Sequence, residues 1–75
     1  KMQNFYKQNI EPYKDRYLNT GFIITRVLER EGKKLTDLSD QEIQEKFHLS
    51  RQHTEIAEKL IKDIQYYNDM IYLVD

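Results

Sequence analysis

Two histidines and several pairs of carboxylates are the residues of this chain that could do chemistry. His48 and His53 are the only histidines, and the chain has no Cys. The two histidines lie five residues apart, whereas two imidazoles that bind one metal ion from the same helical face are spaced four apart. Glutamates spaced three apart, which could work as acid and base, are Glu42 with Glu45 and Glu55 with Glu58. No pattern directs them into a cleft, and a 75-residue bundle has little room for a catalytic pocket. The sequence therefore predicts no enzyme activity, no metal site and no cofactor.

The stretch Gly32-Lys33-Lys34 is similar in order to the end of a phosphate-binding loop. The first Gly of that motif would fall at Val27, and its magnesium-binding hydroxyl residue would fall at Lys34. A helix that ends at Gly32, followed by solvated lysines, explains the stretch without a nucleotide.

Length and composition predict one small domain, residues 1–75, which is either a whole protein or part of a larger one. Hydrophobic residues make up 39% of the chain and charged residues 33%, which is typical of a globular protein. The longest apolar run, Met70 to Val74, is far shorter than the ~18 residues of a membrane span. The missing Cys and the absence of a signal-peptide pattern at the start favour a cytoplasmic location.

The net charge of −1 hides two halves of opposite sign. Residues 1–34 contain eight Lys or Arg and four Asp or Glu, which gives +4, and residues 35–75 contain four and nine, which gives −5. Such a division could attract the two halves to one another or bring two copies together.

Apolar spacing predicts an all-α bundle of three to four helices with a long C-terminal helix. We expect a first helix over residues 2–10 and a second from Pro12 to Glu31, since the residue before a Pro leaves the helical conformation. Core stripes of the second helix are predicted at Tyr13, Tyr17, Ile24 and Leu28, flanked by Leu18, Phe22 and Val27. Gly21 lies inside this helix, and either breaks it or marks the close approach of another backbone.

The third and fourth helices have clear local signals. Ser39 with Glu42 forms a capping box, and Leu38 with Ile43 occupies the positions of a hydrophobic staple. Ser50 is expected to cap a helix from Arg51 of about 24 residues, or ~36 Å. Its seam recurs at spacings of three and four: Ala57, Leu60, Ile64, Tyr67, Ile71 and Val74. Ion pairs are predicted from Glu55 to Lys59 and from Glu58 to Lys62.

Over Asp40 to Leu60 the chain resembles the helix-turn-helix DNA-binding superfamily. In EIQEKFHLSRQ, Ile43 and Phe47 match the packed positions of the first helix, Leu49 packs the turn, and Ser50 caps the second helix. The pattern departs at Gln44, His48 and Thr54, where the superfamily usually has Ala, Gly, and Val or Ile. The resemblance implies a reading helix that brings Arg51, Gln52 and Glu55 near DNA, with phosphates met by Arg26, Arg30, Lys33 and Lys34 from the preceding helix.

Two hypotheses follow from these patterns. The first is a regulatory or adaptor module that binds another protein, or a second copy of itself as a homodimer, through the aromatic-rich C-terminal helix. Its predicted anchors are Tyr66, Tyr67, Met70, Ile71 and Val74. The alternative is a helix-turn-helix regulator that binds DNA. The carboxylates of its proposed reading helix count against this alternative, because DNA affinity comes largely from Lys and Arg.

Overall fold

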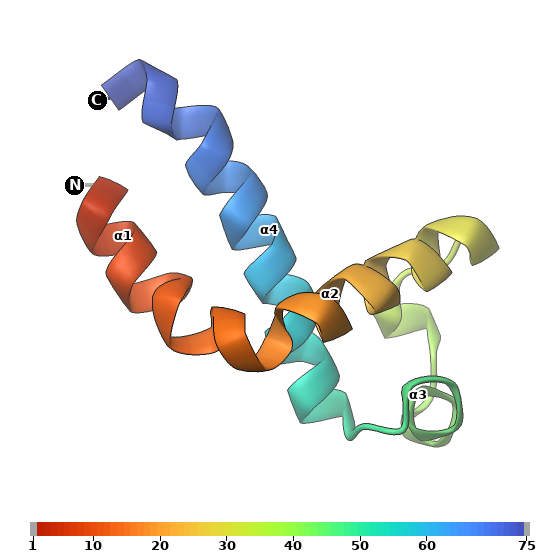
Figure 1. Ribbon diagram of the computed structural model, residues 1–75. Coiled ribbons are helices and arrows are strands. Elements are labelled where there is room, and N and C mark those ends of the chain that lie inside the picture. Colours follow the sequence, from red (N-terminus) through yellow and green to blue (C-terminus); the bar gives the residue numbers. More distant parts are fainter. Residues whose placement is uncertain (1, 75) are drawn as a thin grey trace.

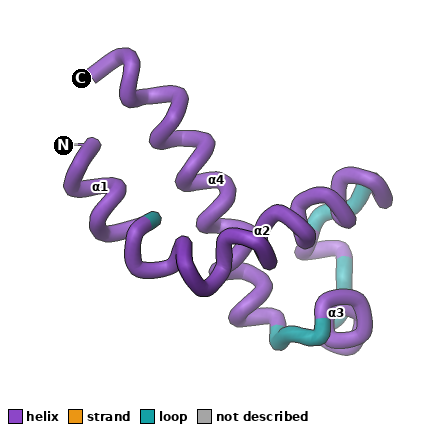
Figure 2. Tube along the Cα trace, in the orientation of Figure 1, coloured by secondary structure: helices purple, strands orange, loops and turns teal. Residues whose placement is uncertain are grey.

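Figure 1 shows the computed structural model of the chain, which describes residues 2–74 and the side chains of residues 2–71. Within this range the backbone forms four α-helices, one short 3-10 helix and no strand. They are α1 (Met2–Asn9), α2 (Glu11–Glu31), η1 (Leu35–Asp37), α3 (Asp40–Phe47) and α4 (Arg51–Val74), joined by short loops (Figure 2). The predicted all-α class with a long C-terminal helix is confirmed.

The chain bends at Ile10, between α1 and α2, so Glu11 is the first residue of α2 and does not leave the helical conformation as predicted. In a continuous helix the Pro12 ring would collide with the carbonyl four residues earlier. The bend keeps most backbone hydrogen bonds, since the Ile10 N–H donates to the Tyr6 carbonyl at 3.0 Å and the Lys14 N–H donates to the Ile10 carbonyl at 2.9 Å. The Ile10 side chain, 2% exposed, fills the inside of the corner.

The second helix runs unbroken through Gly21 and crosses α4 there (Figure 1). A Cβ atom added to Gly21 would lie 2.6 Å from the Ala57 carbonyl oxygen and 2.6 Å from Cγ1 of Ile61. Real carbon atoms do not approach so closely, so only Gly permits this spacing between the two helices. Of the two explanations considered for Gly21, the close approach of another backbone is the correct one.

The predicted helix ends are confirmed by their hydrogen bonds. Gly32 ends α2 in the left-handed conformation, with φ 64°. At the start of α3, the Ser39 hydroxyl accepts from the Glu42 N–H at 3.1 Å, and the Glu42 carboxylate accepts from the Ser39 N–H at 2.9 Å. The unpredicted turn η1 begins where the Lys34 N–H donates to the Asp37 carboxylate at 2.9 Å, and it brings Leu35 and Leu38 into the core.

The main core lies between the C-terminal half of α2, the η1 to α3 segment and the N-terminal half of α4. Its buried members are Ile24, Leu28, Leu35, Leu38, Ile43 and Ala57. Tyr17 and Phe47 pack against its edge. On the outside of α4, Lys62 pairs with Glu58 at 3.8 Å as predicted, whereas Lys59 pairs with Asp63 at 2.6 Å and not with Glu55.

Two residues assigned to core stripes lie on the surface. Tyr13 is 40% exposed and Phe22 is 48% exposed. Because α4 crosses α2 at an angle, it covers only the middle of the α2 stripe and leaves side chains at its margins open.

The molecule is elongated, with principal extents of 42 × 23 × 17 Å. Figure 1 shows α1 and the C-terminal half of α4 as two arms on one side of the crossing, with α3 and η1 on the other. Among the helices described, none has both the length and the apolar content required to cross a membrane.

Candidate functional site

An apolar groove lies where α1, α2 and the C-terminal half of α4 meet. Its volume is about 290 Å³, and its lining residues are Tyr6, Ile10, Lys14, Leu18, Phe22, Ile64, Tyr67 and Asn68. Apart from Lys14 and Asn68, these residues present carbon surface or an aromatic ring. Grooves of this kind usually receive an apolar side chain or a helix face.

The groove exists because the apolar seam of α4 continues beyond the helices that cover it. At the crossing, Ala57 and Leu60 are 0% and 1% exposed. Further along the same seam, Ile64, Tyr67 and Ile71 are only half-buried. The seam therefore has a complete partner over its first half and an incomplete one over its second half.

Lys14 is the one cation in the groove lining. Its Nζ donates to the Tyr6 hydroxyl at 2.6 Å and lies 5.2 Å from the centre of the Tyr6 ring. This hydrogen bond is the main cause of a raised pKa for Lys14. None of the ion pairs found among the described side chains involves Lys14.

The predicted protein-binding residues lie on this part of α4, but α1 covers some of them. The Tyr66 ring packs on Phe5 and the Tyr67 ring packs on Tyr6, each at 5.1 Å between centroids. Tyr66 remains 49% exposed, while Met70 and Ile71 are half-buried. The side chain of Val74 lies outside the described residues.

Sequence reasoning missed the α2 side of the groove. Leu18 and Phe22 were expected to widen a core stripe, and instead they form one wall of the groove. Their signal was present in the sequence, because the apolar stripe of α2 is broader than one crossing helix can bury. Ile23, next to Phe22, is 60% exposed and lines a separate hollow with Phe47 and Leu49.

The segment that resembles a helix-turn-helix has eight residues in α3, a turn over residues 48–50, and α4 from Arg51. His48 adopts the left-handed conformation with φ 58°, at the position where the superfamily usually has Gly. Thr54 is fully buried, and its hydroxyl donates to the Ser50 carbonyl at 2.7 Å. The Ser50 hydroxyl accepts from the His53 N–H at 3.4 Å, at the predicted cap.

The backbone of α3, the turn and α4 is similar to a helix-turn-helix, but the side chains at the start of α4 are poorly suited to contact DNA. The Arg51 guanidinium donates to the Asp40 carboxylate and to the Leu38 carbonyl, which ties it to the start of α3. Gln52 and Glu55 are exposed. The neighbouring outer face of α3 is acidic, with Asp40, Glu42 and Glu45 all exposed, and it would repel phosphates.

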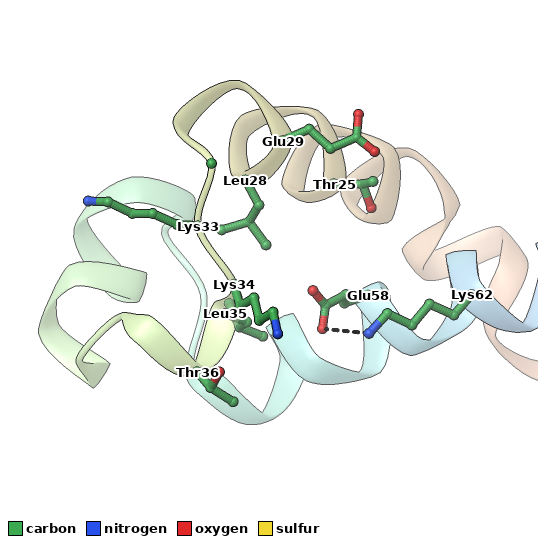
Figure 3. Close-up of a pocket in the computed structure, with 10 residues that line it drawn as sticks. Thr25, Leu28, Glu29, Lys33, Lys34, Leu35, Thr36, Glu58 and Lys62 are labelled. Atoms are coloured by element: carbon green, nitrogen blue, oxygen red, sulfur yellow. Dashed lines mark ion pairs between the residues drawn. The ribbon is translucent and has the colours of Figure 1, made fainter.

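The predicted basic patch is distributed over α2 and the loop that follows it. Arg26 and Arg30 are exposed on α2, and Lys33 and Lys34 follow Gly32. Figure 3 shows Lys33 pointing away from a 570 Å³ groove beside this loop, while Lys34 points toward Glu58 and Lys62. The two lysine side chains therefore point in different directions, although both residues line this groove.

The histidines and carboxylates considered for chemistry do not converge. His48 and His53 are both exposed, and the His53 ring lies 6.2 Å from that of Tyr17. Among the described residues, no cluster of three or more His, Cys, Asp or Glu could hold a metal ion. No protein-family model, curated protein or solved structure matched the chain.

Proposed function

We propose that this domain is a regulatory or adaptor module that binds a protein partner through the apolar groove. The supporting observation is that the monomer has a larger accessible surface and a larger radius of gyration than a compact protein of its size. Its accessible surface is 5688 Å², whereas a compact monomer of 9.2 kDa is expected to expose about 4,900 Å². Its radius of gyration is 13.4 Å, against about 11 Å for a compact chain of this length.

Apolar side chains remain partly exposed at the groove. Phe22 from α2 and the half-buried seam residues Tyr67 and Ile71 from α4 offer anchors to a helical partner. Tyr66 and Met70 lie outside the groove lining, and we retain both, with Val74, as predicted contacts. A cytoplasmic location also stays a prediction.

Labelling of single thiols tests this proposal, because the chain has no Cys of its own. Phe22→Cys places a thiol in the groove, and Ile23→Cys places one on the same helix outside it. We expect a cell extract from the source organism to slow maleimide labelling at position 22 by at least about tenfold, as burial in an interface requires, and to leave position 23 unchanged. Equal rates at both positions in the extract contradict the proposal.

DNA binding through α3 and α4 is the second candidate function. It is favoured by the three-residue turn, in which His48 takes the left-handed conformation that the superfamily usually gives to Gly. The acidic outer face of α3 and the tied Arg51 count against it. Fluorescence anisotropy of a labelled generic duplex at ~50 mM salt tests it. Salt-sensitive binding that Gln52→Ala weakens supports this candidate, and no binding at that salt concentration rejects it.

A further inference from the structure

We infer that α1 is a lid on the C-terminal half of α4, which opens without unfolding of the main core and uncovers the rings of Tyr66 and Tyr67. Both rings are predicted protein-binding residues, so a closed α1 competes with the partner for them. In this respect the inference rests on the proposed function. Its support is the place of α1 outside the core, its surface contacts, the hollows beside it and its short length.

The helix α1 lies outside the main core of the protein. Among the described residues, no member of the buried cluster that forms this core belongs to α1. Figure 1 shows α1 as an arm beside the C-terminal half of α4, continuous with α2 at the Ile10 bend. Ile10 is 2% exposed in the corner, so it can stay in place while residues 2–9 move. The core can therefore keep its contacts when α1 leaves α4.

The contacts that hold α1 on α4 include two pairs of aromatic rings at the surface. Phe5 packs on Tyr66 and Tyr6 packs on Tyr67, each at 5.1 Å between ring centroids. Tyr66 is still 49% exposed, and the other three rings are half-buried. The one buried residue of α1 is Met2. Because an aromatic pair adds only modestly to the effect of burial, these contacts cost less to break than those of the core.

Hollows border α1 where it meets the rest of the molecule. The apolar groove of about 290 Å³ lies against Tyr6 and Ile10. A second hollow of about 130 Å³ lies at the end of α1, between Asn9 and the α4 residues Ile56 and Leu60. Atoms that border a void lack packing partners on that side. The contact between α1 and α4 is therefore less complete than that of a close-packed interior.

The helix α1 is too short to be stable away from α4. It has eight residues, whereas isolated helices shorter than about 12 residues are marginal in water. Its sequence MQNFYKQN has no Ala or Leu, and its Asn and aromatic residues have low helix propensity. Release from α4 is therefore expected to unwind residues 2–9, and the backbone entropy that they recover favours opening.

Amide hydrogen exchange of the full 75-residue chain, followed by NMR, tests the lid without a partner. Amides at positions 8–10 report on α1, because they donate to carbonyls within it. Those of Leu28, Ala57 and Leu60 report on the core. We expect protection at positions 8–10 to be at least about tenfold lower than in the core, and still above that of an unfolded chain.

A core variant separates opening of the lid from global unfolding. Ile24→Val removes one methyl group from a fully buried side chain of the core, which should lower protection of the core amides about two- to tenfold. Positions 8–10 should be unchanged, because the Ile24 contacts persist when α1 is open. Equal losses at both sets of amides overturn the inference, since α1 then opens only with the core. Absence of protection at positions 8–10 also overturns it, since α1 then does not cover α4.

Phe5→Ala tests the competition with a partner. Phe5 contacts Tyr66 and does not line the groove, so its removal loosens the lid and leaves the groove residues in place. In a chain labelled through Phe22→Cys, we expect Phe5→Ala to reduce the amount of cell extract needed for half-protection by about two- to tenfold, because more of the chain is open. Gln8→Ala, at an exposed position of α1, is the matched control and should have no effect.

The two experiments separate failure of the lid from failure of the proposed function. Protection of position 22 that Phe5→Ala leaves unchanged or weakens overturns the competition between α1 and the partner. If no variant is protected by extract, the proposed function is contradicted, and hydrogen exchange alone decides whether α1 opens independently.

Discussion

Replacing Gly21 with Ala adds one methyl group at the point where α2 crosses α4. That methyl carbon would lie 2.6 Å from the Ala57 carbonyl oxygen and 2.6 Å from Cγ1 of Ile61, where ordinary contacts begin at 3.4 Å. The Ile61 side chain can rotate away, but the Ala57 carbonyl belongs to the backbone of α4. The two helices must therefore separate by several tenths of an ångström along their main contact.

Two opposing effects set the size of the change. Inserting a methyl group into a packed contact costs about 1–3 kcal/mol, whereas Ala stabilises a helix interior by about 1 kcal/mol relative to Gly. Because the backbone oxygen cannot move alone, we expect the larger cost and a net loss of about 1–2 kcal/mol. This is a large share of the ~3–5 kcal/mol that a core of this size supplies.

Thermal unfolding followed by circular dichroism at one fixed protein concentration measures the effect. We expect the midpoint to fall by about 5–15 °C, given about 4–8 °C for each kcal/mol in a domain of this length. Asn19→Ala is the matched control, since Asn19 is exposed on the same helix and its replacement should raise the midpoint slightly. If Gly21→Ala is as stable as the wild type, the described approach of α2 to α4 is wrong.

Three further predictions concern the α3–α4 segment. Arg51→Ala should lower the free energy of unfolding by about 1 kcal/mol, because it removes the partly exposed hydrogen bonds to Asp40 and Leu38. Urea unfolding in the absence of DNA measures this loss if the hydrogen bonds are structural. Thr54→Val should change stability by less than about 0.5 kcal/mol in the same assay, because the Ser50 carbonyl still accepts from the backbone N–H of residue 54 at 3.0 Å. Hydrogen bonds from Ser39 lower the pKa of Glu42 below its ordinary value, so its stabilising effect is present at neutral pH and is lost as the pH falls through its folded-state pKa. Glu42→Gln should therefore be less stable than the wild type at pH 7 and approach it in acid, and a difference independent of pH would refute this explanation.

Local signals in the sequence predicted the helix ends well. Ser39 with Glu42, Pro12 and Gly32 each act on backbone groups within four residues, so their effects do not depend on the rest of the fold. The burial of Ile24, Leu28, Ile43 and Ala57 also followed from spacing, because these residues face the centre of the bundle whatever the crossing angle.

The groove could not be located from the sequence in the same way. Phe22 directly follows Gly21, and its side chain points about 100° further round α2. Whether it is buried therefore depends on which neighbouring element covers that side of the helix, and the spacing of apolar residues does not determine this. The covering of Tyr66 and Tyr67 by α1 depends in turn on the direction of the bend at Ile10. The bonds from Arg51 to Asp40 and Leu38 join segments more than ten residues apart, so they too were not predicted.

Photo-crosslinking from position 22 tests the proposed binding groove most directly. Benzoylphenylalanine in place of Phe22 fits the existing aromatic position, and the same group in place of Ile23 reports on the surface outside the groove. In a cell extract from the source organism, we expect position 22 to form a discrete protein adduct and position 23 to form none. An adduct of twice the chain mass identifies a second copy, and a different mass identifies a foreign partner. Adducts of equal yield from both positions, or none from position 22, contradict binding through the groove.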